Sequence, residues 1–296
     1  MLAHKEAIAL GLALGFLFRF YMLRIDYRQY PSYPHGLIAH LSLGFIAAFL
    51  GAVAIPALLA REYTAVTFLA LAAQQFRDIR NLERNTLEHL DETELVPRGP
   101  DYIEGIARVF EGRNYLVMFV ALVTSSLTLW FHPGPGVTGG VLLGLTLAHF
   151  RKGPTLKDIA VVRLGKVNFR GSNLFVDDIL IMNVGLKDSR HLMETLGVGV
   201  VIEPRNDDAR ATLANLGQRQ AITHEASTLL GVRKDFAEPE FTPLCRLNTA
   251  TGRAALFILP VEPDKELAVQ AVRKVPVLES AIRRPLRTQV GREASD

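Results

Sequence analysis

Histidine and acidic side chains are the residues of this chain that could support acid–base catalysis or metal binding, and their spacings fit neither. His224 and Glu225 are neighbours in a helical pattern, where adjacent side chains do not face each other, so they predict a solvated helix surface. Asp177 and Asp178 would point to opposite faces of a strand and predict a strand entering a turn. Four further histidines lie at the ends of apolar segments without metal-ligand spacing: His35, His40, His132 and His149.

Motifs for nucleotide binding and covalent catalysis are missing from the sequence as well. The chain has no G-x-x-x-x-G-K-[ST] loop, no H-E-x-x-H and no nucleophile elbow. Gly197 and Gly199 lack the third glycine of a dinucleotide loop, and the single Cys245 excludes an internal disulfide and a cysteine-built metal site. The sequence identifies no reaction, and we expect a non-enzymatic protein without a metal or cofactor.

Charged residues are distributed very unevenly along the 296 residues. There is no Asp, Glu, Lys or Arg between Gly36 and Ala60, and none between Tyr115 and Phe150. Apolar runs of this length predict helices that cross a lipid bilayer. The net charge of +3 is small and its basic residues are scattered, so we expect the bilayer as a partner and no nucleic acid.

These runs predict a membrane all-α N-terminal bundle of four or five transmembrane helices within residues 1–150. Ala7–Leu23 and Leu37–Ala60 are the first two spans, and Tyr115–Phe150 holds two more. The turn between those two is predicted at His132–Gly136, which reads HPGPG. Tyr63–Phe76 either crosses as a short fifth span or lies flat in the interface. Both alternatives remain open.

Basic residues predict the orientation of the chain and its contacts with lipid. Most of them follow Phe150, so the positive-inside tendency places the C-terminal domain in the cytoplasm. Arg77, Arg80 and Arg84 share one helical face and either contact anionic lipid headgroups or form a solvated face. Arg19, near the end of the first span, is expected to extend to the headgroups.

Residues 151–284 alternate short β-rich runs with helical patterns and predict a cytoplasmic domain of mixed α+β or α/β class. Gly171–Asn173 predicts a hairpin turn, and Leu196–Pro204 and Ala254–Val261 predict buried strands. Asn206 or Asp207 is expected to cap a helix. Helices are predicted at residues 189–195, 207–216, 218–230 and 264–284. Residues 285–296 predict a disordered basic tail.

The segment 77–114 is predicted to be a cytoplasmic loop in which an amphipathic helix starts after Pro100 and turns near Gly112. Asp101 and Glu104 have the spacing of a capping box. Glycine inside a helix costs about 1 kcal/mol relative to alanine, so Gly105 is expected to mark a close contact. The residues predicted to interact with a partner are Tyr102, Ile103, Glu104, Gly105, Ile106, Arg108 and Phe110.

Tyr102–Ala107 spells YIEGIA and resembles the signature of the bacterial YIEGIA family. The resemblance extends to Phe68–Glu83, Gly217–Ala226 and Lys274–Pro285. It implies an integral, multi-pass membrane protein of endospore-forming bacteria that is associated with assembly of the spore envelope. It further implies a location in the cell membrane or in a membrane around the forespore, with no known enzymatic role or cofactor.

Three functions follow as hypotheses. The first is a non-enzymatic scaffold or assembly factor of sporulation, whose partners are other sporulation or membrane proteins. Its helices are rich in small residues, which would also allow a homo-oligomer. The second is a small-molecule or ion conduit regulated by the cytoplasmic domain. The third is a membrane enzyme that acts on lipid or cell-wall precursors through Glu104, Arg108 and Arg113.

Overall fold

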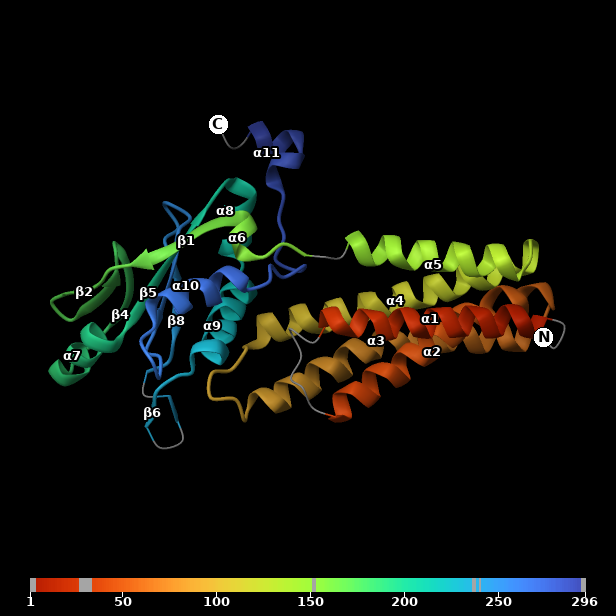
Figure 1. Ribbon diagram of the computed structural model, residues 1–296, viewed down its shortest axis with the longest axis horizontal. Helices are drawn as coiled ribbons and strands as arrows, with labels where there is room; N and C mark the ends of the chain where they lie inside the picture. The colour runs from red at the N-terminus through yellow and green to blue at the C-terminus, as the bar shows by residue number, and fades with distance from the viewer. Residues whose placement is uncertain (1–3, 27–33, 151–152, 236–237, 240, 294–296) are drawn as a thin grey trace. The chain divides into compact units, whose positions relative to one another are not determined.

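A computed structural model describes the chain as two compact units (Figure 1). The described residues are 4–26, 34–150, 153–235, 238–239 and 241–293. Within them, the side chains of residues 24–26, 34–35, 73, 75–77, 150, 234–235, 238–239 and 291 lie outside the description. The helical unit comprises residues 1–84 and 106–152, and the α/β unit comprises residues 85–105 and 153–296. The YIEGIA segment therefore begins in the α/β unit and ends in the helical unit.

Long helices that follow one another along the chain make up the helical unit. They are α1 (Lys5–Asp26), α2 (Pro34–Leu59), α3 (Tyr63–Asp91), α4 (Pro100–Trp130) and α5 (Pro133–Phe150). A break follows Trp130 close to the predicted turn, but the turn predicted at His132–Gly136 is wrong in its bounds, because α5 already begins at Pro133. The predicted turn near Gly112 is wrong, because α4 runs through this residue without interruption.

The prediction of four or five transmembrane helices is wrong. Among the described residues, two helical segments are long and apolar enough to cross a membrane, Lys5–Leu23 and Gly36–Leu59. The apolar part of α3 covers only Tyr63–Ala72, which is too short, and charged residues follow it. In α4 and α5, charges before the apolar stretch and several glycines lower the hydropathy. The two apolar segments indicate association with a membrane, and the rest of the chain is a body of mixed helix and sheet.

Glycines allow close approach between helices of the helical unit. A Cβ atom on Gly51 of α2 would overlap the backbone carbonyl of Met118 on α4. On α1, a Cβ atom at Gly11 would lie 2.7 Å from the backbone oxygen of Ala121. Because backbone atoms cannot move aside as a flexible side chain can, these positions require glycine. The helices of this unit are thus fitted to each other by shape.

Arg19 does not extend to solvent or headgroups as expected. Its side chain is 0% exposed, and the guanidinium lies 5.3 Å from the ring centroid of Phe110. The aliphatic stem of Arg19 packs against Gly44, where any Cβ atom would overlap it. The reason is local: Gly44 leaves a space on α2 that accepts the stem, and the ring of Phe110 faces the cation.

The α/β unit contains two antiparallel sheets and a short hairpin. The larger sheet has the order β1 (Ala160–Gly165), β5 (Val198–Pro204), β9 (Ala254–Ile258) and β8 (Leu244–Leu247). The second sheet is a meander of β2 (Val167–Arg170), β3 (Asn173–Val176) and β4 (Ile179–Asn183). The hairpin consists of β6 (Lys234–Asp235) and β7 (Glu238–Pro239). The helices are α6 (Leu156–Ile159), α7 (Lys187–Leu196), α8 (Asp207–Ala214), α9 (Leu216–Leu230), α10 (Lys265–Lys274) and α11 (Gln289–Glu293).

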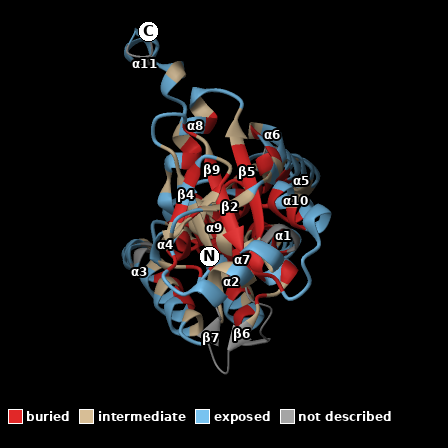
Figure 2. Ribbon diagram, turned by 90° about the vertical axis from the view of Figure 1, so that its left-hand side faces the viewer, coloured by how far each residue is buried: buried red, intermediate tan, exposed pale blue. Residues whose placement is uncertain are grey.

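The larger sheet separates two apolar cores. One core joins its face to helices α9 and α10, for example through Ile202, Ile222 and Val272. The other joins the opposite face to the meander and α7, through residues such as Phe257 and Met193. The central strands β5 and β9 are consequently buried along most of their length (Figure 2). Strands covered on both faces appear in the sequence as nearly continuous apolar runs.

Several local predictions for the α/β unit are confirmed, and others need correction. β5 and β9 occupy the predicted strand segments, and Asn206 caps α8 by accepting the N–H of Ala209 at 2.9 Å. The hairpin expected around the turn Gly171–Asn173 is extended into a meander, because Asp177 adopts a positive φ of 55° and turns the chain between β3 and β4. α10 ends at Lys274, well before the predicted end at residue 284, because Pro276 follows. Residues 285–287 form a 3-10 turn and α11 follows it in the predicted tail.

Candidate functional site

Tyr102, the first residue of the YIEGIA motif, is fixed to helix α9 of the α/β unit. It is 0% exposed, and its hydroxyl group donates a hydrogen bond of 2.8 Å to Oε1 of Glu225. Its backbone N–H donates to Oε1 of Gln220 at 3.2 Å. The ring contacts His224 edge-on, with 6.2 Å between the centroids. The start of α4 is thus held by three side chains of α9, which lie more than 100 residues further along the chain.

The residues just before Tyr102 also pack on α9. Nδ1 of His224 is 2.8 Å from the backbone oxygen of Val96, and the histidine is 5% exposed. A Cβ atom on Gly217 would lie 2.8 Å from the backbone oxygen of Asp101, so only glycine fits there. Gly99 has a φ of +83°, in the region that favours glycine, and directs the chain into α4. We call residues 91–105 the connecting segment.

Acidic side chains stabilise the turn within the connecting segment. The carboxylate of Asp91 accepts the backbone N–H groups of Arg98 at 2.7 Å and of Gly99 at 3.1 Å. Nη1 of Arg98 lies 3.2 Å from Glu94 and 3.5 Å from Asp91. Because the arginine is 5% exposed, these carboxylates compensate a charge that is almost fully removed from water.

The C-terminal part of the chain meets the same helix. Gln218 is 0% exposed, accepts the N–H of Leu278 at 2.8 Å and donates to the backbone oxygen of Pro276 at 3.2 Å. A Cβ atom on Gly105 would lie 2.7 Å from Oγ of Ser280. Residues 102–105 of the YIEGIA motif therefore meet the segments 217–226 and 274–285, which were also quoted for the family resemblance, within the α/β unit.

Burial shifts the pKa values of the ionisable groups at this junction in the direction that disfavours charge. Burial raises the pKa of Tyr102 well above its ordinary value, and the neighbouring Glu225 adds to the rise. Burial also raises the pKa of Glu225, against the opposing effects of the Tyr102 hydroxyl and Arg98. Burial lowers the pKa of His224, although its bond to Val96 opposes this. In all three groups, burial is the largest cause of the shift.

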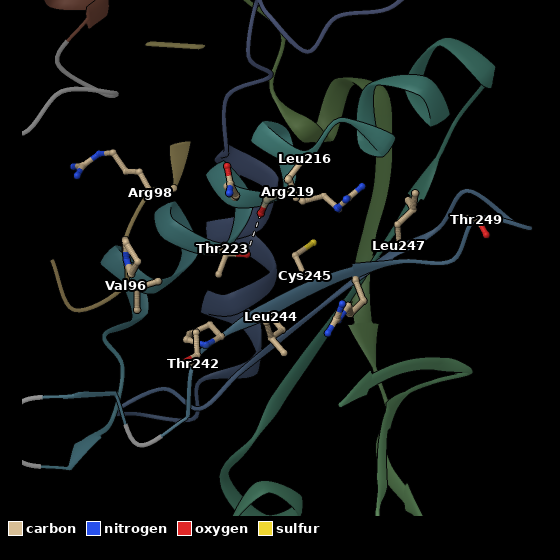
Figure 3. Close-up of a pocket in the computed structure, with 15 residues that line it drawn as sticks. Val96, Arg98, Leu216, Arg219, Thr223, Thr242, Leu244, Cys245, Leu247 and Thr249 are labelled. Atoms are coloured by element: carbon tan, nitrogen blue, oxygen red, sulfur yellow. Dashed lines mark hydrogen bonds between the residues drawn. The ribbon is translucent and has the colours of Figure 1, made fainter. Parts of the chain in front are cut away.

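Next to this junction lies a cavity of about 500 Å³ between the connecting segment, α9 and strand β8 (Figure 3). We call it the β8 groove. It is lined by residues 96–99, 216, 219, 220, 223, 242–247 and 249. Gln220 belongs both to the lining and to the hydrogen bond with Tyr102. In Figure 3, Cys245 on β8 points toward α9, whereas Arg98 is directed away from β8.

The chemistry available in the β8 groove is that of binding. Burial raises the pKa of the Cys245 thiol to about 12, with Arg219 opposing the shift, so the thiol remains protonated near neutral pH. A protonated thiol is a poor nucleophile and a poor metal ligand. Within the described ranges, no group of three or more His, Cys, Asp or Glu residues could hold a metal ion. The remaining polar lining groups are hydroxyl groups, arginine side chains, the amide of Gln220 and strand backbone, and apolar side chains such as Leu216 and Leu244 complete the lining.

The structure places most of the predicted interaction residues inside the chain. Five of them are buried: Tyr102, Ile103, Gly105, Ile106 and Phe110. Glu104 is half-buried and Arg108 is exposed. The close contact expected at Gly105 is made within the chain, to Ser280. The role of these residues toward a partner stays a prediction.

The capping box expected at the start of α4 is not what satisfies its first turn. The helix already begins at Pro100, and the free N–H of Tyr102 is satisfied by Gln220. For the predicted lipid contacts, Arg77 lies outside the described side chains. Arg80 is half-buried with Nη1 3.9 Å from Glu111, and Arg84 is half-buried as well. Contact with headgroups also stays a prediction.

Sequence reasoning missed the inward face of α9. The solvated surface expected at His224 and Glu225 is wrong, because both side chains bond to the connecting segment. The available signal was the spacing of Ala221, Ile222 and Ala226, which marks the neighbouring positions as one packed face. The connecting segment covers this face of α9, and no sequence pattern predicted that contact.

A second cluster of buried polar groups lies in the helical unit. Nε2 of His40 is 3.2 Å from Oε1 of Glu83, and the two side chains are 6% and 7% exposed. The His40 ring also lies 4.5 Å from the ring of Phe110. Asn114, one turn further along α4, is 0% exposed, and neither polar atom of its side chain has a hydrogen-bond partner among the described residues.

The two apolar helical segments suggest association with a membrane, and within the α/β unit Tyr102, the first residue of the YIEGIA segment, is held on α9 beside a groove. The sequence model of the YIEGIA protein family matches residues 7–288, and the chain belongs to this family. Its relatives include the uncharacterized protein YphB of Bacillus subtilis (strain 168), which is 49% identical over 278 residues covering 94% of each chain. No solved structure matches the chain.

Proposed function

We propose that the protein is a non-enzymatic, membrane-associated scaffold that takes part in assembly of the spore envelope. In this proposal α1 and α2 attach it to the membrane, and the α/β unit faces the cytoplasm and binds another protein. The β8 groove carries the proposal, because it combines a cavity of about 500 Å³ with binding groups only. The acid, phenol and imidazole groups beside it are used to hold the chain itself. The relative from an endospore-forming bacterium supports a place in sporulation.

The experiment is photo-cross-linking from the full-length protein in sporulating cells. A benzophenone side chain would be placed at Thr242, an exposed residue of the groove, and for comparison at Val261, an exposed residue outside it. We expect one defined protein adduct from the α/β unit that forms during sporulation. The proposal fails if neither site gives a protein adduct while the tagged protein is present at normal levels in the membrane.

A small-molecule or ion conduit is kept as a second candidate function because of one observation in the helical unit. His40 and Glu83 form a buried pair, and Asn114 is buried nearby on α4. Buried polar groups in apolar helices often mark a path for ions or solutes. Liposomes containing the purified protein would test it: a selective flux that His40→Ala abolishes would favour this function over the scaffold.

For the hypothesis of an enzyme acting on lipid or cell-wall precursors, the structure leaves less support. Of the three residues assigned to headgroup contact, Arg108 is exposed and Glu104 is half-buried. Arg113 is only 3% exposed, so its guanidinium does not reach a headgroup from this position. We therefore do not extend this hypothesis further.

A further inference from the structure

We propose that the β8 groove accepts an extended acidic segment of a partner protein, which adds to strand β8 as a further antiparallel or parallel strand. This inference rests on the proposed scaffold function and specifies its partner. Three observations carry it: the position of the cavity along the strand, the place of β8 in the sheet, and the charge of the lining.

The cavity follows the edge of β8 and not one of its faces. Consecutive side chains of a strand point to opposite faces of the sheet. Leu244 packs into the core toward the meander, whereas Cys245 and Leu247 pack into the core toward α9. The cavity nevertheless contacts every residue from Thr242 to Leu247. Contact with consecutive residues of both faces favours a cavity that reaches the side of the strand.

Among the strands that the structure describes, β8 is the last of its sheet, and none of them pairs with the ladder groups on its outer side. β8 pairs with β9, and the order of the sheet ends there. At the opposite edge, the backbone oxygen of Val162 on β1 already accepts a bond of 3.2 Å from Nη2 of Arg273. An exposed strand edge is the template on which an added peptide strand pairs through its backbone. Four residues of β8 would pair with a segment of about four to six residues.

The lining favours an acidic segment. It contains Arg98, Arg219 and Arg246, and the described lining residues include no Asp or Glu. Arg98 is compensated by Asp91 and Glu94. Arg219 bonds the backbone oxygens of residues 213 and 214, and Arg246 bonds that of residue 181. These carbonyl partners carry no net charge, so Arg219 on the α9 side of β8 and Arg246 on its meander side each keep a positive charge for carboxylates of a ligand.

The test selects peptides from a displayed library of random octapeptides against the full-length protein in detergent. We expect the enriched peptides to carry at least two Asp or Glu residues and to bind more weakly as salt increases. On binding, amide hydrogen exchange of Leu244–Leu247 should slow more than that of β1, because only β8 gains pairing. Fluorescence anisotropy of a labelled enriched peptide then gives the affinity of each variant.

Charge variants at an exposed position separate this proposal from a general effect on folding. Thr242 is exposed, so Thr242→Glu should weaken binding about fivefold and Thr242→Lys should not, although both change the same residue. Arg246→Glu should weaken it about tenfold, and Arg246→Lys should retain most of the affinity. The matched control is Thr228→Glu, at an exposed position on α9 outside the lining.

Other outcomes overturn the inference. It fails if no peptide is enriched, if enriched peptides lack acids, or if bound peptides leave the exchange of Leu244–Leu247 unchanged. It also fails if the protein alone forms a dimer that protects β8, because the occupant is then a second copy of the chain. In each of these cases a protein adduct from Val261 in sporulating cells would still support the scaffold, whereas loss of all adducts would remove both proposals.

Discussion

The helical unit and the α/β unit bury their polar groups in different ways. In the helical unit, Thr124 and Thr128 bond within their own helix, to the backbone oxygens of Val120 and Thr124 at 2.8 Å, and Ser125 is an exception that donates to the backbone oxygen of Ala52 on α2. In the α/β unit, Tyr102 bonds to Glu225 and Gln218 to Leu278, across large separations in sequence. Helix contacts in the first unit depend mainly on shape, with the pairs His40–Glu83 and Ser125–Ala52 added, whereas the second unit depends on particular donor and acceptor pairs.

The largest effect is expected from filling a close contact in the helical unit. In Gly51→Ala the new methyl group would overlap the backbone carbonyl of Met118, which cannot move aside. We expect the free energy of unfolding to fall by about 3 kcal/mol, measured by thermal unfolding in detergent with helical circular dichroism. Gly134→Ala is the control, since nothing lies within 4 Å of its Cβ position. Equal melting temperatures for both variants would contradict fitting by shape.

The next effect is expected from removing one hydrogen-bonding side chain of the α/β unit. Gln218→Met keeps much of the volume but leaves the N–H of Leu278 and the backbone oxygen of Pro276 buried without their partner. Unsatisfied buried groups should lower the free energy of unfolding by about 2 kcal/mol, measured by urea unfolding. Gln289→Met, on α11 with a bond only to Glu293, should change it by less than about 0.5 kcal/mol. If Gln218→Met left the free energy of unfolding unchanged, packing alone would be holding this junction.

Tyr102→Phe is expected to have a smaller effect that depends on pH. Loss of the bond to Glu225 should lower the free energy of unfolding by about 1 kcal/mol near neutral pH. Because the pKa of Glu225 is raised above 4.5 in the folded state, the folded protein binds the proton more tightly. Its stability is therefore highest below the unfolded pKa and falls as pH rises through the folded pKa.

The pH profile supplies the measurement for that variant. The Tyr102 hydroxyl opposes the rise in the pKa of Glu225, so Tyr102→Phe should extend the loss of stability to higher pH. Urea unfolding at a series of pH values, with Tyr63→Phe at an exposed position as the control, would measure it. If the stability of Tyr102→Phe and of the unmodified protein changed with pH in parallel, the hydroxyl group of Tyr102 would have no effect on the pKa of Glu225.

The smallest effect is expected at the surface turn of the meander. Burial raises the pKa of Asp177, but the N–H of Lys166 and the Arg163 guanidinium outweigh it and lower the pKa overall. The carboxylate thus stabilises the fold above its unfolded pKa, and this stability is lost as pH falls through the folded pKa. Asp177→Asn should cost about 0.5 kcal/mol at neutral pH and nothing in acid, since Asn tolerates the positive φ. Asp188→Asn, at an exposed position, is the control. If Asp177→Asn lost as much stability in acid as at neutral pH, this result would contradict a stabilising ion pair.

Local features of the fold could be predicted where neighbouring residues determine them. The charge-free run in α2 predicts an apolar helix, the run in β9 predicts a buried strand, and Asn206 predicts the cap of α8. The number of membrane helices could not be predicted in the same way. A run without charges also arises in helices that bury an apolar face in a folded body, as Val117 and Val120 do in α4.

The candidate site could be predicted only in part, because its contacts join distant segments. The sequence indicated that Gly105 makes a close contact, but it could not indicate Ser280. It predicted that Asp101 caps the first turn of α4, whereas the side chain that accepts a backbone N–H of this turn is that of Gln220. Local rules describe a helix end with the residues beside it, and here the partner lies on another helix.

Asn215 has a consequence for how the α/β unit opens. This one residue is the C-cap of α8 and, through its side chain bonded to the N–H of Gln218 at 3.0 Å, the N-cap of α9. Arg219 of α9 in turn donates to the last carbonyl groups of α8. The C-terminal end of α8 and the N-terminal end of α9 therefore cannot open independently of each other. Opening of α8 would free the first turn of α9 as well, so amide exchange on both sides of Asn215 should follow one common opening event.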